Sequence, residues 1–159
     1  MSSATIHQPT TIINRSELEI DDSSRIDSYC LINASGGVRL REQSVIHAGS
    51  HVVGNNCFDM GPRSVVTYNC VVLTSTADLG YPASSVVAKE ERRTISGDVR
   101  LKSESFVGSG SIIMPGVTLH TGAAVAANTF VDEDVPSWTI RYPNGEERKR
   151  EKESSEFRE

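Results

Sequence analysis

The chain has 159 residues, of which 37% are hydrophobic and only 6% aromatic, and it carries a net charge of -5. This length suits a single domain, and the acidic balance argues against a nucleic-acid-binding protein. No apolar run approaches the ~20 residues that a membrane span needs, and the amino terminus lacks the features of a signal peptide. We therefore expect a soluble, cytoplasmic protein with a narrow core of small aliphatic side chains.

The amino-terminal half begins without a pattern and then acquires a six-residue period. Residues 1–17 show no periodicity and are predicted to form an arm. From residue 18, large aliphatic residues recur every sixth position, with breaks at 35–37 and 54–56 that are rich in glycine and asparagine. Such residues accept the positive φ angles of tight turns, so we interpret the breaks as corner loops. The periodic residues are Ile20, Ile26, Ile32, Leu40, Ile46, Val52, Met60, Val66 and Val72.

The segment 73–94 has no period at all. A long irregular segment inside a compact repeat is usually functional, so we predict an excursion loop that contributes to a site. A disordered excursion without a role is the alternative.

The carboxy-terminal half repeats the six-residue period seven times, at Ile95, Leu101, Val107, Ile113, Leu119, Val125 and Val131. A helix would need apolar positions three or four apart, and a hairpin strand would alternate every two residues. A chain that turns every six residues closes a triangular coil after three turns, which predicts that Ile95, Ile113 and Val131 stack in one interior column. The predicted fold is an all-β, left-handed parallel β-helix of about seven coils over residues 18–138, because a single coil cannot bury its own core.

The end of the chain departs from the repeat after Pro136. Trp138, Ile140 and Tyr142 are expected to cap the open core, and residues 139–159 are predicted to form a charged tail, either a solvated helix or a frayed end. The three cysteines, Cys30, Cys57 and Cys70, are odd in number and lack a CxxC spacing, so they are interpreted as core residues rather than as disulfides or zinc ligands.

Two stretches resemble a known family. The run VGSGSIIMPGVTLHTGAAVAANTFVDEDVPSWTI, residues 107–140, is similar to the last coils of the hexapeptide-repeat acetyltransferases. The stretch LEIDDSSRIDSYCLINASGGVRL, residues 18–40, resembles the opening coils of a subgroup associated with bacterial surface-polysaccharide synthesis. The resemblance implies transfer of an acetyl group from acetyl-CoA to a hydroxyl or amine of a sugar or nucleotide-sugar. It also implies a homotrimer with its sites between subunits.

The same resemblance suggests the residues that would contact the cofactor. The pantetheine arm of CoA would run along the small-residue turns at Gly110 and Ala126. Trp138 and Arg141 stand where the family's tail approaches CoA, although the sequence from Arg141 to Gly145 departs from the family's Gly-x-Pro-Ala-Lys motif.

Acetyl transfer also needs a general base near the attacking group. Related sugar O-acetyltransferases carry a histidine in the excursion loop, but here that stretch reads Thr76-Ala77-Asp78. Asp78 is thus the nearest candidate, with Glu91 at the other end of the loop. His47 directly follows a core position and should point outward, onto a face that a neighbouring subunit covers. The plainer alternatives are solvated loop charge for the two acids and an interface histidine for His47.

Other readings of the pattern remain open. The missing loop histidine slightly favours an amino-sugar acceptor, since an unprotonated amine needs less help than a hydroxyl. A non-catalytic trimeric scaffold or binding module would also explain why the loop has no histidine. A carbonic-anhydrase-like zinc site would need three histidines from adjacent subunits, and the spacing of His47, His51 and His120 ranks it last, so no metal is predicted. Arginines at 92, 93, 148 and 150 are candidates for phosphate contacts or for plain surface charge.

Overall fold

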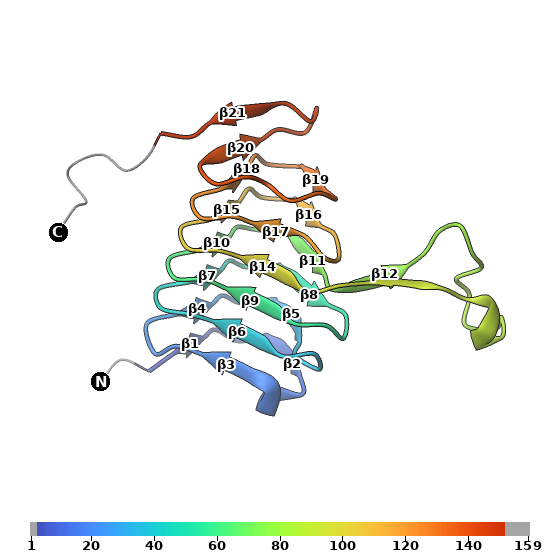
Figure 1. The fold of residues 1–159 in the computed structure, drawn as a ribbon. Coiled ribbons are helices and arrows are strands. Elements are labelled where there is room, and N and C mark those ends of the chain that lie inside the picture. The colour runs from blue at the N-terminus through green and yellow to red at the C-terminus, as the bar shows by residue number, and fades with distance from the viewer. Residues whose placement is uncertain (1–2, 152–159) are drawn as a thin grey trace.

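The computed structural model describes residues 3–151, which wind into a stack of about seven coils. Successive coils place short strands in three sheets, which are parallel except for the last strand of one of them and form the walls of a triangular prism (Figure 1). The predicted left-handed parallel β-helix is confirmed. Sheet A contains β1 (Thr5–Ile6), β4 (Arg25–Ile26), β7 (Val45–Ile46), β10 (Val65–Val66), β15 (Phe106–Val107), β18 (Ala124–Val125), β20 (Thr139–Arg141) and β21 (Glu147–Lys149).

The other two walls are built in the same way. Sheet B contains β2 (Thr11–Ile13), β5 (Leu31–Asn33), β8 (His51–Val53), β11 (Val71–Leu73), β16 (Ile112–Ile113) and β19 (Phe130–Val131). Sheet C contains β3 (Leu18–Ile20), β6 (Val38–Leu40), β9 (Phe58–Met60), β14 (Val99–Leu101) and β17 (Thr118–Leu119).

Coil length changes along the stack because extra residues are inserted at one corner. Ile26 pairs with Ile46, 20 residues later, whereas Val107 pairs with Val125, 18 residues later. The additional residues lie between sheets B and C, at 34–37 and 54–57, so the sequence breaks are corner loops as predicted. The excursion loop leaves the stack at this same corner, between β11 and β14 (Figure 1).

The excursion loop corrects one predicted core position. It begins as an antiparallel hairpin of β12 (Ser75–Ala77) and β13 (Thr94–Ser96), which projects from the body. Ile95 lies in β13 opposite Thr76 and is 45% exposed, so its predicted place in the interior column was wrong. Val72 occupies that place and pairs with Ile113 in β16, which pairs with Val131 in β19. Ile95 lies six residues before Leu101 although it is outside the core. The side chains of a hairpin strand alternate every two residues, and six is a multiple of two, so a hairpin residue can match the six-residue period by chance.

Both ends of the described chain differ from the prediction. The sequence suggested an arm at the amino-terminal end and a helical or frayed tail at the carboxy-terminal end. Residues 3–17 form the first coil, since β1 pairs with β4 and β2 with β5, and Ile6 and Ile12 pack against the core. Their pattern is weak because an end coil has a neighbour on one side only. At the other end, β20 and β21 form an antiparallel hairpin over residues 139–149. The tail residues 152–159 lie outside the described residues.

The three cysteines are free. Cys30 and Cys70 are buried and Cys57 is half-buried, which confirms the core assignment for the first two. Burial raises the pKa of all three thiols, because the apolar surroundings disfavour the thiolate.

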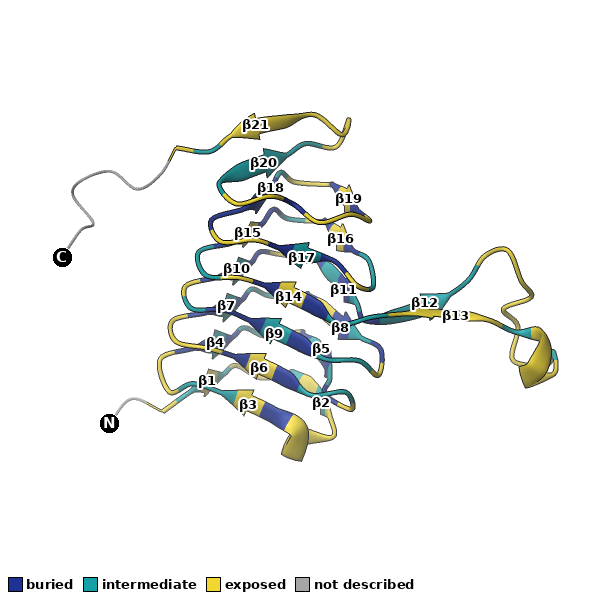
Figure 2. Cartoon of the chain, in the orientation of Figure 1, coloured by how far each residue is buried: buried dark blue, intermediate teal, exposed yellow. Residues whose placement is uncertain are grey.

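The exposed residues of the three walls, which Figure 2 shows in yellow, differ in chemical character. Sheet C is charged, with ion pairs between Glu19 and Arg39 and between Arg41 and Asp59. Sheets A and B expose aromatic and aliphatic side chains in the later coils, namely Phe106, Ile112 and Phe130. Within residues 3–151, no helix is both long and apolar enough to cross a membrane.

Candidate active site

The corner between sheets A and B carries a row of side chains at one level of successive coils. The residue after each inward-facing sheet A residue lies at this corner, where the chain leaves the strand. The register aligns Ile26, Ile46 and Val66, so the following residues, Asp27, His47 and Thr67, come next to one another. In the later coils the equivalent positions are Gly108 and Ala126. The row is thus polar in the early coils and small in the later ones.

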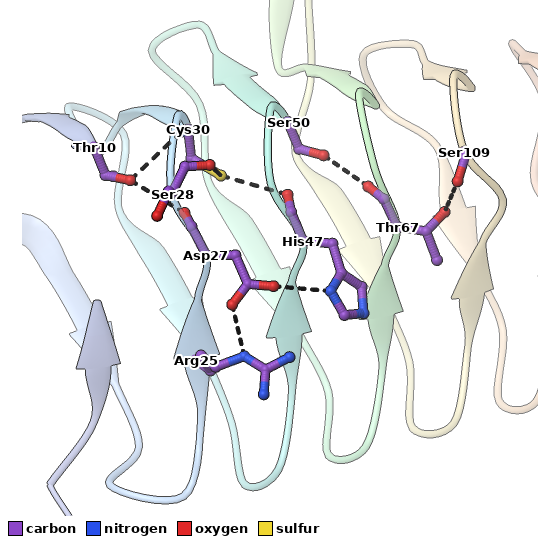
Figure 3. Close-up of polar contacts among 9 residues, drawn as sticks. All are labelled: Thr10, Arg25, Asp27, Ser28, Cys30, His47, Ser50, Thr67 and Ser109. Carbon is purple, nitrogen blue, oxygen red and sulfur yellow. Dashed lines mark hydrogen bonds and ion pairs between the residues drawn. The ribbon is translucent and has the colours of Figure 1, made fainter. Parts of the chain in front are cut away.

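Asp27 and His47 form the central pair of this row. The Nδ1 atom of His47 lies 2.9 Å from Oδ2 of Asp27, and both side chains are about four-fifths buried, at 22% and 19% exposed (Figure 3). Arg25 places its Nε 2.7 Å from the other carboxylate oxygen. The ring of Tyr68 stacks on the imidazole, with centroids 4.7 Å apart and planes inclined by 22°.

This arrangement orients the imidazole for proton transfer. A carboxylate beside Nδ1 favours the tautomer with its proton on that atom, so that Nε2 can accept a proton from a neighbouring group. Tyr68 restricts the ring on one face, and the ion pair with Arg25 holds the carboxylate. The corner therefore holds an imidazole beside a carboxylate, a pairing that general-base chemistry can use.

A network of hydroxyls fixes the backbone around this pair. The Thr67 hydroxyl donates to the carbonyl of Val107 at 2.6 Å. The Ser109 hydroxyl donates to the hydroxyl oxygen of Thr67 at 3.1 Å (Figure 3). The Ser50 hydroxyl donates to the Thr67 carbonyl at 2.7 Å. Because these bonds link neighbouring coils, they hold the row at a constant spacing.

Asp78 lies at the end of β12 in the projecting hairpin. Its backbone N–H donates to the Arg93 carbonyl at 2.9 Å, and its carboxylate accepts the Gly80 N–H at 3.0 Å. The side chain is half-buried and retains a second oxygen for other partners. Glu91 ends the short 3-10 helix η2 (Lys89–Glu91) and is exposed.

Within one chain the structure does not bring His47 and Asp78 together. His47 precedes β8, at the corner where the chain enters sheet B, whereas Asp78 belongs to the hairpin that leaves after β11, at the opposite edge of that sheet. The two candidates can share a site only if the hairpin of one subunit meets the corner of another. No residue pattern in a single chain could decide this point.

Two members of this cluster were not singled out from the sequence, Asp27 and Tyr68. A signal for Asp27 was present, because Asp27 follows Ile26 just as His47 follows Ile46, one 20-residue coil later. Recognising it required the true coil length, which the corner insertions obscured. Tyr68 follows Thr67 in a turn, and nothing in the period predicts that its ring would lie on His47.

The predicted cofactor-contacting residues occupy two corners of the last coils. Gly110 and Ala126 lie on the sheet A–B corner, where Gly110 has a φ of +74° and a methyl group there would come within 2.3 Å of the Asn128 side-chain oxygen. Trp138 covers Gly122 at the sheet C–A corner. Arg141 is adjacent to Ala126 through the backbone bond from the Ala126 N–H to the Arg141 carbonyl.

The charge of Arg141 is already compensated. Its Nε donates to Glu147 at 2.8 Å, and its guanidinium also donates to the Asp134 carbonyl at 3.0 Å. The side chain is only 12% exposed. Arg141 therefore stabilises the terminal hairpin, and a phosphate contact would have to compete with Glu147.

The remaining histidines do not join the cluster. His7, His51 and His120 are exposed, and His120 lies 3.8 Å from Asp134. In the described part of the chain, no group of three or more His, Cys, Asp or Glu side chains could hold a metal ion.

Comparison with known proteins supports an acyltransferase relationship. No family model matches the chain. A dTDP-4-amino-4,6-dideoxy-D-glucose acyltransferase of Escherichia coli is 28% identical over 126 residues, which are 77% of this chain and 66% of that protein. The match thus spans slightly less than two thirds of the relative's length.

Solved structures show the same architecture. AntD, an N-acyltransferase from Bacillus cereus solved with dTDP and 3-hydroxybutyryl-CoA, superposes with a TM-score of 0.85 at 25% identity, covering 92% of this chain and 79% of AntD. A maltose O-acetyltransferase from Clostridium difficile 630 superposes with a TM-score of 0.59 at 14% identity, covering 95% and 68% of the two chains. The chain is therefore similar to the hexapeptide-repeat sugar acyltransferases, as the sequence motifs indicated. Among these proteins its similarity is greater to the acyltransferase of the dTDP-linked amino sugar and to AntD than to the maltose enzyme.

Proposed function

We propose that this protein transfers an acetyl group from acetyl-CoA to the amino group of a nucleotide-linked sugar. The observation that carries the proposal is the Asp27–His47 pair on a β-helix that is similar to a dTDP-4-amino-4,6-dideoxy-D-glucose acyltransferase and to AntD, which was solved with dTDP. An amine acceptor agrees with the absence of a histidine at Thr76-Ala77-Asp78. Acetyl is the proposed acyl group because the small residues Gly110 and Ala126 resemble those of the acetyltransferases.

In the proposed reaction the acceptor nitrogen attacks the thioester carbonyl. A C–N bond forms, the C–S bond breaks, and CoA leaves as a thiolate that takes up a proton. A base must accept the proton that the nitrogen loses, and we assign this role to Asp78 or His47, with Glu91 as a further acid at the loop. Asp27 would orient His47. We also propose that the reaction takes place in the cytoplasm, in the synthesis of a surface polysaccharide.

Purified protein tests this proposal directly. We expect calorimetry to show binding of acetyl-CoA, and mass spectrometry to show a mass gain of one acetyl group on dTDP-4-amino-4,6-dideoxyglucose. A matched reaction with 3-hydroxybutyryl-CoA checks the choice of acyl group. If the protein neither binds an acyl-CoA nor acylates any amino sugar or sugar offered, the non-catalytic scaffold becomes the better description.

We also propose that the protein is a homotrimer with its sites between subunits. Residues 105–130 contain no Lys, Arg, Asp or Glu, and their outward side chains include Phe106, Ile112 and Phe130. Apolar surface of this kind is usually covered by a partner. A trimer in which sheets A and B face neighbours would leave the charged sheet C in water and would allow a hairpin to reach the Asp27–His47 corner of the next subunit.

Light scattering tests the assembly. We expect a mass three times the 17.3 kDa of the chain. We also expect Phe130→Asp to lower that mass, because it places a charge in the apolar face, while Arg39→Asp on sheet C leaves it unchanged. A stable monomer of the wild type at micromolar concentration contradicts the proposal.

A further inference from the structure

The projecting hairpin and the segment that joins its strands line an open cavity of about 420 Å³ that shares no residue with the Asp27–His47 corner. Its walls come from both strands of the hairpin and from the turn that joins them. The lining residues are Ser75, Thr76, Ala77, Ala83, Lys89, Arg92, Arg93 and Thr94. The cavity thus combines three cationic side chains with three hydroxyls, and its lining contains no carboxylate.

The three cations of this cavity differ from seven other arginines in residues 3–151, which are paired with acidic side chains. Within residues 3–151, no ion pair joins Lys89, Arg92 or Arg93 to a carboxylate. Seven other arginines have an acid within ion-pair distance, whereas Arg15 and Arg150 donate to backbone carbonyls instead. The paired arginines are Arg25, Arg39, Arg41, Arg63, Arg100, Arg141 and Arg148.

A ring contact positions the Arg93 guanidinium, and a backbone hydrogen bond brings Arg92 and Lys89 into one turn. The guanidinium of Arg93 lies over the ring of Tyr81, 4.3 Å from the centroid, which leaves its N–H edge free to bind an anion. The Arg92 N–H donates to the Lys89 carbonyl at 3.2 Å, so both side chains belong to one tight turn. The Nε of Arg92 is buried without a hydrogen-bond partner, and a buried donor left unpaired is costly unless a ligand satisfies it.

We propose that this cavity binds the diphosphate of the nucleotide-linked acceptor, an inference that rests on the proposed function. Guanidinium groups bind phosphate oxygens in pairs, and three cations match the charge of a diphosphate better than that of a carboxylate. The position also suits the reaction. Asp78 lies opposite Arg93 in the hairpin, through the bond from its N–H to the Arg93 carbonyl, so the proposed base is next to a residue that lines the cavity.

The diphosphate of CoA has the same chemistry, and the test must separate the two sources. Calorimetry on the full chain would measure binding of thymidine diphosphate, inorganic pyrophosphate and CoA to the wild type and to Arg92→Gln and Arg93→Gln. We expect each variant to bind thymidine diphosphate and pyrophosphate about tenfold more weakly or worse, as loss of a charge-assisted hydrogen bond predicts, and to bind CoA within about twofold of the wild type.

Arg148→Gln is the matched control. Its guanidinium also lies over a tyrosine ring, 5.3 Å from the centroid of Tyr142, but it is paired with Glu146. We expect this control to bind all three probes like the wild type. Arg92→Lys keeps the charge and should recover part of the lost affinity, and a melting curve shows whether each variant folds.

The outcomes separate this inference from the proposed function. Unchanged binding of thymidine diphosphate and pyrophosphate in both variants overturns the inference, as does a wild type that binds neither probe. A loss of CoA affinity alone would assign the cavity to the donor and overturns its assignment to the acceptor. If the wild type binds the two probes through these arginines but transfers no acyl group, the diphosphate site stands and the proposed reaction fails.

Discussion

Replacing Asp78 by asparagine is expected to lower acyl transfer about a hundredfold, which is the usual scale for losing a general base. The substitution keeps the shape of the side chain, and its oxygen can still accept the Gly80 N–H that holds the turn. CoA affinity should change little, because the pantetheine arm is proposed to lie along Gly110 and Ala126. Steady-state kinetics with the nucleotide-linked amino sugar would measure the fall in kcat.

His47→Ala is the companion variant to Asp78→Asn and tests whether the base comes from the corner instead. If His47 is the base, Asp27→Asn should lower kcat less than His47→Ala does, because it disturbs the orientation of the imidazole without removing it. Asp22→Asn serves as a control, since Asp22 is exposed in a turn. If Asp78→Asn and His47→Ala both keep full turnover, neither residue is the base, and the assignment of the active site is wrong.

Ile113→Ala is expected to lower the free energy of unfolding by about 2–5 kcal/mol. Ile113 is fully buried, with Val72 and Val131 as its neighbours in the adjoining coils, so truncation removes apolar contacts and leaves a cavity in a narrow core. Urea denaturation at one fixed protein concentration would measure the loss, because assembly makes stability depend on concentration.

Ile95→Ala is the matched control for that measurement. The same side chain is removed, but from a hairpin strand where it is 45% exposed, so a change within about 1 kcal/mol is expected. Equal losses for the two variants would contradict the observed column and would favour the arrangement that the six-residue period predicts.

The sequence by itself determined the repeat and the fold class. The six-residue period places Val107, Ile113 and Leu119 inside without knowledge of any partner, because each coil pairs only with its neighbours and contacts are set by spacing along the chain. The same logic identified the corner loops and located the excursion between β11 and β14. It also placed His47 after a core residue, and hence on the outside.

Tertiary structure decided what local spacing cannot encode. Ile95 shares the period but belongs to a hairpin, because pairing between β12 and β13 competes with pairing in the stack. Residues 3–17 show too little pattern to be recognised, yet they gain order by pairing with β4 and β5. Asp27 and Tyr68 meet His47 only because corner insertions make the early coils 20 residues long. These contacts depend on the register between coils, and register is a property of the assembled stack.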